Sequence, residues 1–377
     1  MVVVRALRGL GDMLCVVPAL RALRAGLPRA RITLLGLPEA RSFVRRYSAY
    51  LDDFLEFPGF PGIPEKPVDA RALPAFFRQV HDRHFDLALQ MHGSGTFSNA
   101  FTVLLSARVT AGCYLDALSR PNPETFMPYR ARESEVRRWL ALMTFLGMPA
   151  AGEFLEFPID SHDLQEFDAL EEARDLPPGS YVCIHPGANE DRRRWSPHKF
   201  AAVGDGLAAR GLQVVLTGSA GERMLAAETA EAMRARPLDL SGRTSLGVLA
   251  VLLAGARLLV SNDTGVSHLA DALRLPSVVV FLASDPERWA PLDRARHRVV
   301  GLPAEGNARG DCPECDPASR CLVDACRRAQ AAARVLDPAA VSVDDVLDQA
   351  ASLLDTERPA PAGWKTNAIA DTGGETS

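Results

Sequence analysis

A glycine-containing turn near the amino terminus is the first place where the residue types suit chemistry. Residues 8–12 read Arg-Gly-Leu-Gly-Asp and follow an apolar run at residues 2–7. Two glycines allow a tight turn and a close approach of the main chain to a ligand. A dinucleotide fingerprint would add a third glycine at position 14 and an acidic residue about 20 positions later, and neither is present. Asp12 stands where a helix starts and its ionised form is favoured, so it is a candidate general base or simply a helix cap.

A second candidate site follows the apolar run at residues 258–262, where residues 261–268 read Ser-Asn-Asp-Thr-Gly-Val-Ser-His. Asp263, Thr264 and Gly265 open the next helix, so we expect their main-chain N–H groups to be free to bind an anion such as diphosphate. His268 lies about one helical turn further and can add a donor to the same phosphates. A purely structural role for His268 is the alternative.

A third candidate site spans residues 185–195, which read His-Pro-Gly-Ala-Asn-Glu-Asp-Arg-Arg-Arg-Trp. Gly187 lets the main chain approach a ligand, and the three arginines offer fixed cations for phosphate, with a solvated face as the alternative. A further turn at residues 217–222 ends in Glu222. This carboxylate can accept hydrogen bonds from sugar hydroxyls or favour the start of its own helix.

The elements that must position these turns alternate between strand and helix along nearly the whole chain. This alternation predicts an α/β fold of two Rossmann-like domains with parallel sheets facing an interdomain cleft, and ligands outside the C-terminal ends of the strands. The expected strands are residues 2–7, 31–35, 85–90, 181–185, 213–217, 258–262 and 277–281, and the expected helices are residues 12–25, 39–47, 133–146, 163–174 and 197–210.

The distribution of polar residues, prolines and glycines predicts the domain limits. Residues 1–150 form the first domain, 151–176 a linker and crossing helix, 177–356 the second domain, and 357–377 a disordered tail. Residues 57–74 carry seven prolines and glycines. Such a segment is either an ordered insertion or lid, or a plain surface excursion.

Composition excludes several classes of protein. The 377 residues are too many for one ordinary core and suit two domains. A net charge of −5 lacks the basic footprint of a nucleic-acid binder. No apolar stretch approaches the roughly 20 residues that span a bilayer, and the first residues do not form a signal peptide, so we expect a cytoplasmic protein. Seven cysteines argue against a disulfide framework; the role of Cys312, Cys315, Cys321 and Cys326, as zinc ligands or a reduced thiol cluster, stays open.

Taken in order, these motifs resemble the glycosyltransferase family 9 proteins, whose best-known members are the heptosyltransferases of lipopolysaccharide core assembly. The resemblance rests on residues 9–20, 185–195, 240–246, 261–270 and the cysteine spacing at 312–321. It implies a GT-B fold with the acceptor site mainly in the first domain and the nucleotide-sugar site in the second. It also implies transfer with inversion, of heptose from ADP-heptose, to a lipopolysaccharide-core or related glycan acceptor.

The resemblance also implies roles for individual residues. Asp12 becomes the general base, and Gly9, Gly11 and His92 form the acceptor-side turns. Arg193 stands where heptosyltransferases have a lysine two residues before the tryptophan, and Thr244 stands where some members have an apolar residue against the base. The donor-binding residues it implies are Gly187, Arg193, Glu222, Thr244, Asp263, Thr264, Gly265 and His268. No Asp-x-Asp pair is evident, so we expect transfer with no metal and no other cofactor.

Other classes remain open from the sequence. A sugar-nucleotide epimerase of the same fold would need no acceptor. A nicotinamide-dependent oxidoreductase is disfavoured because the first turn lacks the third glycine. A non-catalytic protein of this fold would bind a nucleotide sugar without turnover. The expected partners are a nucleotide-diphosphate sugar and a glycolipid or glycan acceptor, and not nucleic acid. We expect a monomer whose membrane contact, if any, is peripheral at the inner face of the plasma membrane.

Overall fold

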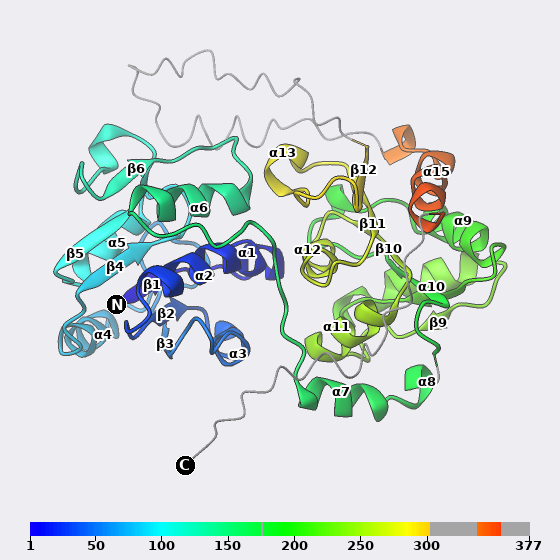
Figure 1. The fold of residues 1–377 in the computed structure, drawn as a ribbon, viewed down its shortest axis with the longest axis horizontal. Helices are drawn as coiled ribbons and strands as arrows, with labels where there is room; N and C mark the ends of the chain where they lie inside the picture. Colours follow the sequence, from blue (N-terminus) through cyan, green and yellow to red (C-terminus); the bar gives the residue numbers. More distant parts are fainter. Residues whose placement is uncertain (175, 302–337, 356–377) are drawn as a thin grey trace. The chain divides into compact units, whose positions relative to one another are not determined.

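The chain folds into two compact units, Met1–Pro158 and Ile159–Ser377. A computed structural model describes residues 1–174, 176–301 and 338–355. Each unit contains one parallel sheet covered by helices (Figure 1). Within the described residues, every helix is too short or too polar to cross a bilayer.

The sheet of the first unit has six parallel strands in the order β3-β2-β1-β4-β5-β6. Its strands are β1 (Val2–Val4), β2 (Thr33–Gly36), β3 (Asp53–Glu56), β4 (Leu87–Gln90), β5 (Val109–Tyr114) and β6 (Phe126–Pro128). Its helices are α1 (Leu10–Leu14), α2 (Val17–Gly26), α3 (Ala40–Arg46), α4 (Leu73–His81), α5 (Ser98–Leu104) and α6 (Glu135–Phe145).

The sheet of the second unit has six parallel strands in the order β12-β11-β10-β7-β8-β9. Its strands are β7 (Tyr181–His185), β8 (Gln213–Leu216), β9 (Leu238–Asp239), β10 (Leu258–Asn262), β11 (Ser277–Phe281) and β12 (His297–Gly301). Its described helices are α7 (Ser161–Asp168), α8 (Glu171–Arg174), α9 (Pro197–Ala208), α10 (Arg223–Ala232), α11 (Leu246–Gly255), α12 (Gly265–Ala272), α13 (Pro286–Trp289) and α15 (Val343–Leu354).

Both sheets follow the same winding. Counted from its own first strand, each sheet has the order 3-2-1-4-5-6, with the first and fourth strands adjacent at the centre. In such sheets ligands bind at the point where the strand order reverses, beyond the C-terminal ends of those two strands. The loops after β1 and β4 in the first unit, and after β7 and β10 in the second, are therefore where a ligand site is expected.

Each unit buries an apolar core of its own. In the first, Val2 and Val4 on one face of β1 pack with Phe57 and Phe101. In the second, Ile184 and Val260 pack with Trp195. Strands buried on both faces need continuous apolar runs, which is why the central strands were readable from the sequence.

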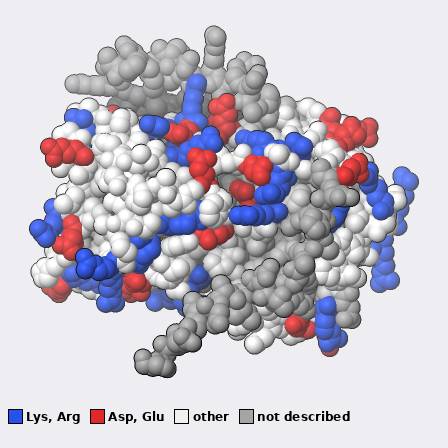
Figure 2. All heavy atoms as spheres, in the orientation of Figure 1, with Lys and Arg blue, Asp and Glu red and all other residues white. Residues whose placement is uncertain are grey.

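Several charged side chains form ion pairs. Arg24 pairs with Asp52 at 2.6 Å, and Arg83 with Asp53 at 2.8 Å. On the face drawn in Figure 2, basic and acidic side chains are interspersed. This arrangement fits the net charge of −5.

The expected helix at residues 12–25 is wrong, because two helices occupy this stretch. Helix α1 ends at Leu14 and α2 begins at Val17, with Pro18 in its first turn. A proline ring clashes with the carbonyl four residues earlier, here that of Leu14, and has no N–H to offer it. The glycine turn is therefore followed by a short helix of its own.

The change of unit falls after Pro158 rather than after residue 150. Residues 151–158 pack on the first unit: Arg21 donates to the carbonyls of Ala151 and Phe154 at 2.9 and 2.7 Å, and the Tyr47 hydroxyl donates to the carbonyl of Glu156 at 2.8 Å. Helices α7 and α8, also placed in the linker, belong to the second unit. The expected disordered tail at 357–377 and the cysteines Cys312 to Cys326 lie outside the described residues.

Candidate active-site residues at the two switch points

The turn after β1 holds Asp12 in the first turn of α1. A Cβ atom at Gly9 would lie 2.3 Å from Asp12 Oδ2, so glycine leaves room for the carboxylate in the position it occupies. Gly11 is buried inside α1, and Asp12 is half-buried. Gly9 therefore makes room for the carboxylate as well as for the turn itself.

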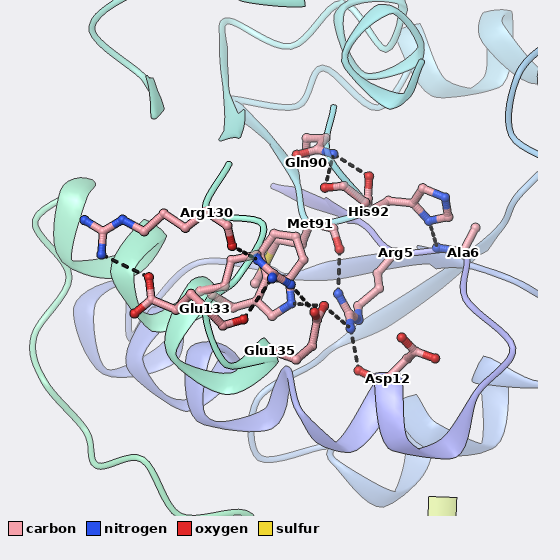
Figure 3. A network of polar contacts seen from close by, with 12 residues as sticks. Arg5, Ala6, Asp12, Gln90, Met91, His92, Arg130, Glu133 and Glu135 are labelled. Carbon is pink, nitrogen blue, oxygen red and sulfur yellow. Dashed lines mark hydrogen bonds and ion pairs between the residues drawn. The ribbon is translucent and has the colours of Figure 1, made fainter. Parts of the chain in front are cut away.

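A buried arginine supports this turn from within the unit. Arg5 is fully buried and donates to the carbonyl of Asp12 at 2.5 Å and to the carbonyl of Met91 at 2.6 Å. In Figure 3 the dashed line from the Arg5 guanidinium to Asp12 ends at the main-chain carbonyl. Arg5 therefore holds the main chain of Asp12 through its carbonyl.

The charge of Arg5 is balanced by residues of α6. Glu135 lies 3.8 Å from Arg5, forms an ion pair with the buried Arg138, and accepts a 3.0 Å hydrogen bond from the indole of Trp139. The Arg5 guanidinium also lies over the Trp139 ring, 5.1 Å from its centroid. Buried charges are tolerated when they are paired and hydrogen-bonded in this way.

The loop after β4 contributes His92, which is buried next to the same turn. His92 Nδ1 accepts a 3.2 Å hydrogen bond from the N–H of Ala6, so the neutral ring carries its proton on Nε2. That nitrogen faces Glu65 Oε2 at 3.5 Å. Burial raises the pKa of Glu65, but its contact with His92 and the charge of Arg8 outweigh burial, and the pKa lies below its usual value. Glu65 belongs to residues 57–74, whose Ile63 packs in the core, so this segment is anchored.

In the second unit, β7 ends at His185, which lies close to Glu222, and Gly187 is packed against the same carboxylate. His185 Nε2 lies 3.7 Å from Glu222 Oε2, and His185 Nδ1 lies 3.0 Å from the Thr217 hydroxyl. A Cβ atom at Gly187 would lie 2.1 Å from Glu222 Oε1, so glycine makes room for the carboxylate. Glu222 also accepts 2.7 Å hydrogen bonds from the main-chain N–H and hydroxyl of Ser219.

Asn262, at the end of β10, joins the two loops of this switch point. Its amide donates to the carbonyl of Pro186 at 2.8 Å and accepts from the N–H of Trp195 at 2.9 Å. The turn at 186–195 is thus tied to the turn that follows β10. Asn262 lay inside a motif singled out from the sequence, but its bonding required the structure.

Arg193 faces the turn after β10. Its guanidinium lies 3.6 Å from the Asp263 carboxylate and 3.0 Å from Glu190. Asp263 is buried and also accepts a hydrogen bond from the Ser284 hydroxyl. The expectation that the Asp263 N–H is free to bind an anion is wrong, since it donates to the carbonyl of Val280 at 3.0 Å and extends the sheet by one residue.

The start of α12 carries the remaining donor-side residues. Thr264 is the N-cap with an extended main chain, and Gly265 is the first helical residue. His268 is buried one turn later, its ring 6.2 Å from that of Trp289. Thr244 is half-buried in the loop before α11, two residues after Gly242, whose N–H donates to the carbonyl of Gly218 at 2.7 Å. This bond brings the Thr244 loop to the turn that carries Glu222.

The neighbours of Arg192 and Arg194 are acidic residues close in sequence. Arg192 pairs with Glu190 at 2.6 Å, and Arg194 pairs with Asp191 and donates to the carbonyl of Ala188 at 2.8 Å. Of the three, Arg193 is the one whose guanidinium lies beside Asp263 in the turn after β10.

Sequence reasoning missed the residues that support the first site: Arg5, Glu65, Glu135, Arg138 and Trp139. One signal was available, because Arg5 is a charged residue at the end of an otherwise apolar buried strand. A charge in that position is rare unless it is paired.

Comparison with known proteins adds a family. The model of "Glycosyltransferase family 9 (heptosyltransferase)" matches residues 73–312, which is more than half of the chain. This match contains the donor-side residues and His92, while the turn with Asp12 lies before it.

Curated relatives match over shorter segments. The chain is 36% identical over 123 residues to lipopolysaccharide heptosyltransferase 2 of Escherichia coli K12, covering 31% of this chain and 35% of the relative. It is 35% identical over 115 residues to lipopolysaccharide heptosyltransferase 3 of Escherichia coli, covering 30% of this chain and 34% of the relative. The chain thus matches about a third of the length of each relative.

Solved structures match over nearly the whole chain. A family 9 glycosyl transferase from Veillonella parvula superposes with a TM-score of 0.70 at 20% identity, covering 94% of this chain and 96% of that one. The ADP-heptose lipopolysaccharide heptosyltransferase II of Escherichia coli gives 0.68 at 18% identity, covering 94% and 98%. The predicted α/β class, a GT-B fold with two Rossmann-like units, is confirmed.

Proposed function

The chain belongs to glycosyltransferase family 9, and from this premise we propose that it moves heptose from ADP-heptose to a lipopolysaccharide-core or related glycan acceptor, with inversion at the anomeric carbon. The names of its relatives support this donor and this class of acceptor. The family favours group transfer over the epimerase alternative.

The observation that carries the proposal is the carboxylate of Asp12 at the switch point of the first unit. A carboxylate in this position repels phosphate and suits an uncharged ligand with hydroxyl groups. It can accept a proton from a sugar hydroxyl that lies within hydrogen-bonding distance. The first unit is therefore proposed to bind the acceptor, with Gly9, Gly11 and His92 forming the turns around it.

The second switch point suits a nucleotide diphosphate. Arg193 and the N-terminus of α12 at Thr264 and Gly265 offer positive charge and hydrogen-bond donors, and His268 lies one turn further. The carboxylate of Asp263 would repel phosphate. We therefore propose that Asp263 acts indirectly, by forming an ion pair with Arg193 and so positioning its guanidinium. Glu222 is proposed to accept hydrogen bonds from the hydroxyls of the nucleoside, with Thr244 in the adjacent loop.

In the proposed reaction, the acceptor oxygen attacks the anomeric carbon from the side opposite the diphosphate. Asp12 takes the hydroxyl proton as the new glycosidic bond forms. The bond between the anomeric carbon and the diphosphate oxygen breaks, and its electron pair leaves with ADP. Fixed donors and cations on the diphosphate stabilise the charge that develops there.

We expect this transfer to need no divalent metal, because Arg193 and the start of α12 supply positive charge to the leaving group. Turnover should be unchanged after EDTA treatment and after addition of Mg²⁺. The enzyme is proposed to act as a cytoplasmic monomer that meets its glycolipid acceptor peripherally at the inner face of the plasma membrane.

The test is an assay of the full chain with ADP-heptose and a panel of lipopolysaccharide-core acceptors. We expect ADP release that depends on the acceptor, and a product whose anomeric configuration, read by NMR coupling constants, is opposite to that of the donor. Turnover of ADP-heptose without an acceptor would support an epimerase instead. Donor binding without turnover across the panel would support a non-catalytic binding protein.

A further inference from the structure

Arg5 occupies a position that normally holds an apolar side chain. It directly follows β1, and side chains alternate between the two faces of a strand. Val2, Val4 and Ala6 pack into the core on one face, so Arg5 projects with Val3 toward the opposite face, where it meets α6. The guanidinium is fully buried and cannot touch a substrate.

The two hydrogen bonds of Arg5 join the two loops of the switch point. One goes to the carbonyl of Met91, the first residue after β4. The other goes to the carbonyl of Asp12, the third residue of the five-residue helix α1 and one of its last four carbonyls. The last four carbonyls of a helix have no partner within the helix, so an external donor is favourable at this end.

The charge of Arg5 is kept in this position by a network of buried partners (Figure 3). Glu135 lies 3.8 Å from it, pairs more closely with the buried Arg138, and accepts a hydrogen bond from the indole of Trp139. The network holds two guanidinium groups and one carboxylate, and the carbonyls of Met91 and Asp12 provide further acceptors for the Arg5 guanidinium. The guanidinium therefore has one well-defined position, and so do the two carbonyls it binds.

We propose that Arg5 is a positioning residue for the transfer reaction: its guanidinium ties the main chain of Asp12 to the end of β4 and so fixes the base at the switch point. This inference rests on the proposed function of Asp12 as general base. It predicts that Arg5 controls the rate of the chemical step and leaves donor binding unaffected, because its contacts all lie in the first unit. Lysine cannot replace it fully, since one ammonium group does not reproduce the two fixed donors of a planar guanidinium.

The experiment compares Arg5→Lys and Arg5→Met with the control Arg24→Met in the full chain. Arg24 is also largely buried in the first unit and bonds to the carbonyls of Ala30 and Tyr50 and to Asp52, away from the Asp12 turn. We expect kcat to fall about 100-fold in Arg5→Met, the scale seen when a catalytic group shifts by about 1 Å. In Arg5→Lys we expect a fall of about tenfold, and in Arg24→Met a kcat within twofold of wild type. The Kd for ADP, measured by calorimetry, should stay within twofold in all three.

A second measurement does not depend on transfer. Hydrogen exchange of the peptide covering residues 9–16 should speed up in Arg5→Met and Arg5→Lys and not in Arg24→Met. If wild type transfers no sugar but this exchange pattern is found, the proposed function fails and the structural role of Arg5 stands. If Arg5→Met does not fold, Arg5→Lys decides the case. Wild-type kcat, or wild-type exchange at residues 9–16, in the folded Arg5 variants would overturn the inference. An equal loss of kcat in Arg24→Met would also overturn it.

Discussion

A histidine–glutamate pair lies at the switch point of each unit, but the surroundings of the two pairs differ. In the first unit His92 faces Glu65 at 3.5 Å, and the neighbouring turn is held by the charged guanidinium of Arg5. In the second unit His185 faces Glu222 at 3.7 Å, and the neighbouring turns are held by the neutral amide of Asn262. The sheets around them have the same winding.

This difference separates what the fold determines from what the side chains determine. The shared winding places a ligand site beyond the central strands of both sheets. A carboxylate on a glycine turn then suits a proton acceptor in the first unit, while a guanidinium beside a helix N-terminus suits an anion in the second. The chemistry comes from the residues placed on the fold and not from the fold itself.

The largest expected effect comes from removing the carboxylate of the first site. Asp12→Asn keeps the size of the side chain and removes its ability to accept a proton. We expect kcat to fall by about 10³-fold or more, within the range for loss of a general base, while the Kd for ADP-heptose changes by less than twofold. Steady-state kinetics and calorimetry measure the two quantities.

The control for this substitution is Asp69→Asn, which removes an exposed carboxylate of the same unit. Its kcat should equal that of wild type. Retention of kcat in Asp12→Asn would contradict the role of Asp12 as general base. A fall in donor affinity would contradict the assignment of the base and the anion site to different units.

The next effect tests the cation of the second site. Arg193→Ala should weaken donor binding about 10- to 100-fold, since a hydrogen bond to a charged group is worth about 1.5–3 kcal/mol. Arg192→Ala is a matched control, because Arg192 is adjacent in sequence and forms an ion pair with Glu190 at 2.6 Å. Its Kd for ADP-heptose should stay within about twofold of wild type. Equal losses in both variants would indicate a general effect of positive charge rather than a contact made by Arg193.

The parts of the fold that the sequence predicted are those where one physical signal dominates. The expected strands at 181–185, 258–262 and 277–281 coincide with β7, β10 and β11, because strands buried on both faces are continuous apolar runs. The strands that were not predicted are β3, β5, β6, β9 and β12. Four of these lie at the edges of their sheets, where strands carry polar residues, such as Asp53 and Glu56 in β3 and His297 and Arg298 in β12.

The sequence predicted the turns that carry the candidate site residues, but not the buried residues that hold these turns in place. Glycines, Asp12 and Arg193 are visible as local motifs, whereas the partners of Arg5 come from Met91 and from Glu135, far along the chain. These contacts depend on the order of strands in the sheet. The same limit explains the error at Asp263, whose N–H continues the pairing of β10 with β11 by one residue.

A smaller effect tests why glycine follows β7. In Gly187→Ala the new Cβ would lie 2.1 Å from Glu222 Oε1. The flexible end of Glu222 can swing away, so we expect little loss of stability but loss of its contact with His185 and about a tenfold weaker donor Kd, equal to about 1.4 kcal/mol. The matched control is Gly221→Ala, where the nearest atom lies 3.9 Å away. An unchanged donor affinity in Gly187→Ala would remove Glu222 from the donor site.

The smallest effect concerns pH and sharpens the contrast between the two histidine–glutamate pairs. Burial lowers the pKa of His185, and the charge of Glu222 opposes this only in part. Burial raises the pKa of Glu222, but His185 and Ser219 outweigh it and the pKa is lowered. Both folded pKa values therefore lie below the unfolded ones, and the unfolded chain binds more protons as the solution is acidified.

It follows that the free energy of unfolding falls as the pH drops below about 6.5 because of His185, and falls further below about 4.5 because of Glu222. We expect the loss between pH 7.5 and 5.5, measured by urea unfolding, to be smaller in His185→Gln than in wild type. His198→Gln removes an exposed histidine of the same unit and should lose as much as wild type. Parallel pH curves for wild type and His185→Gln would mean that burial does not hold His185 neutral.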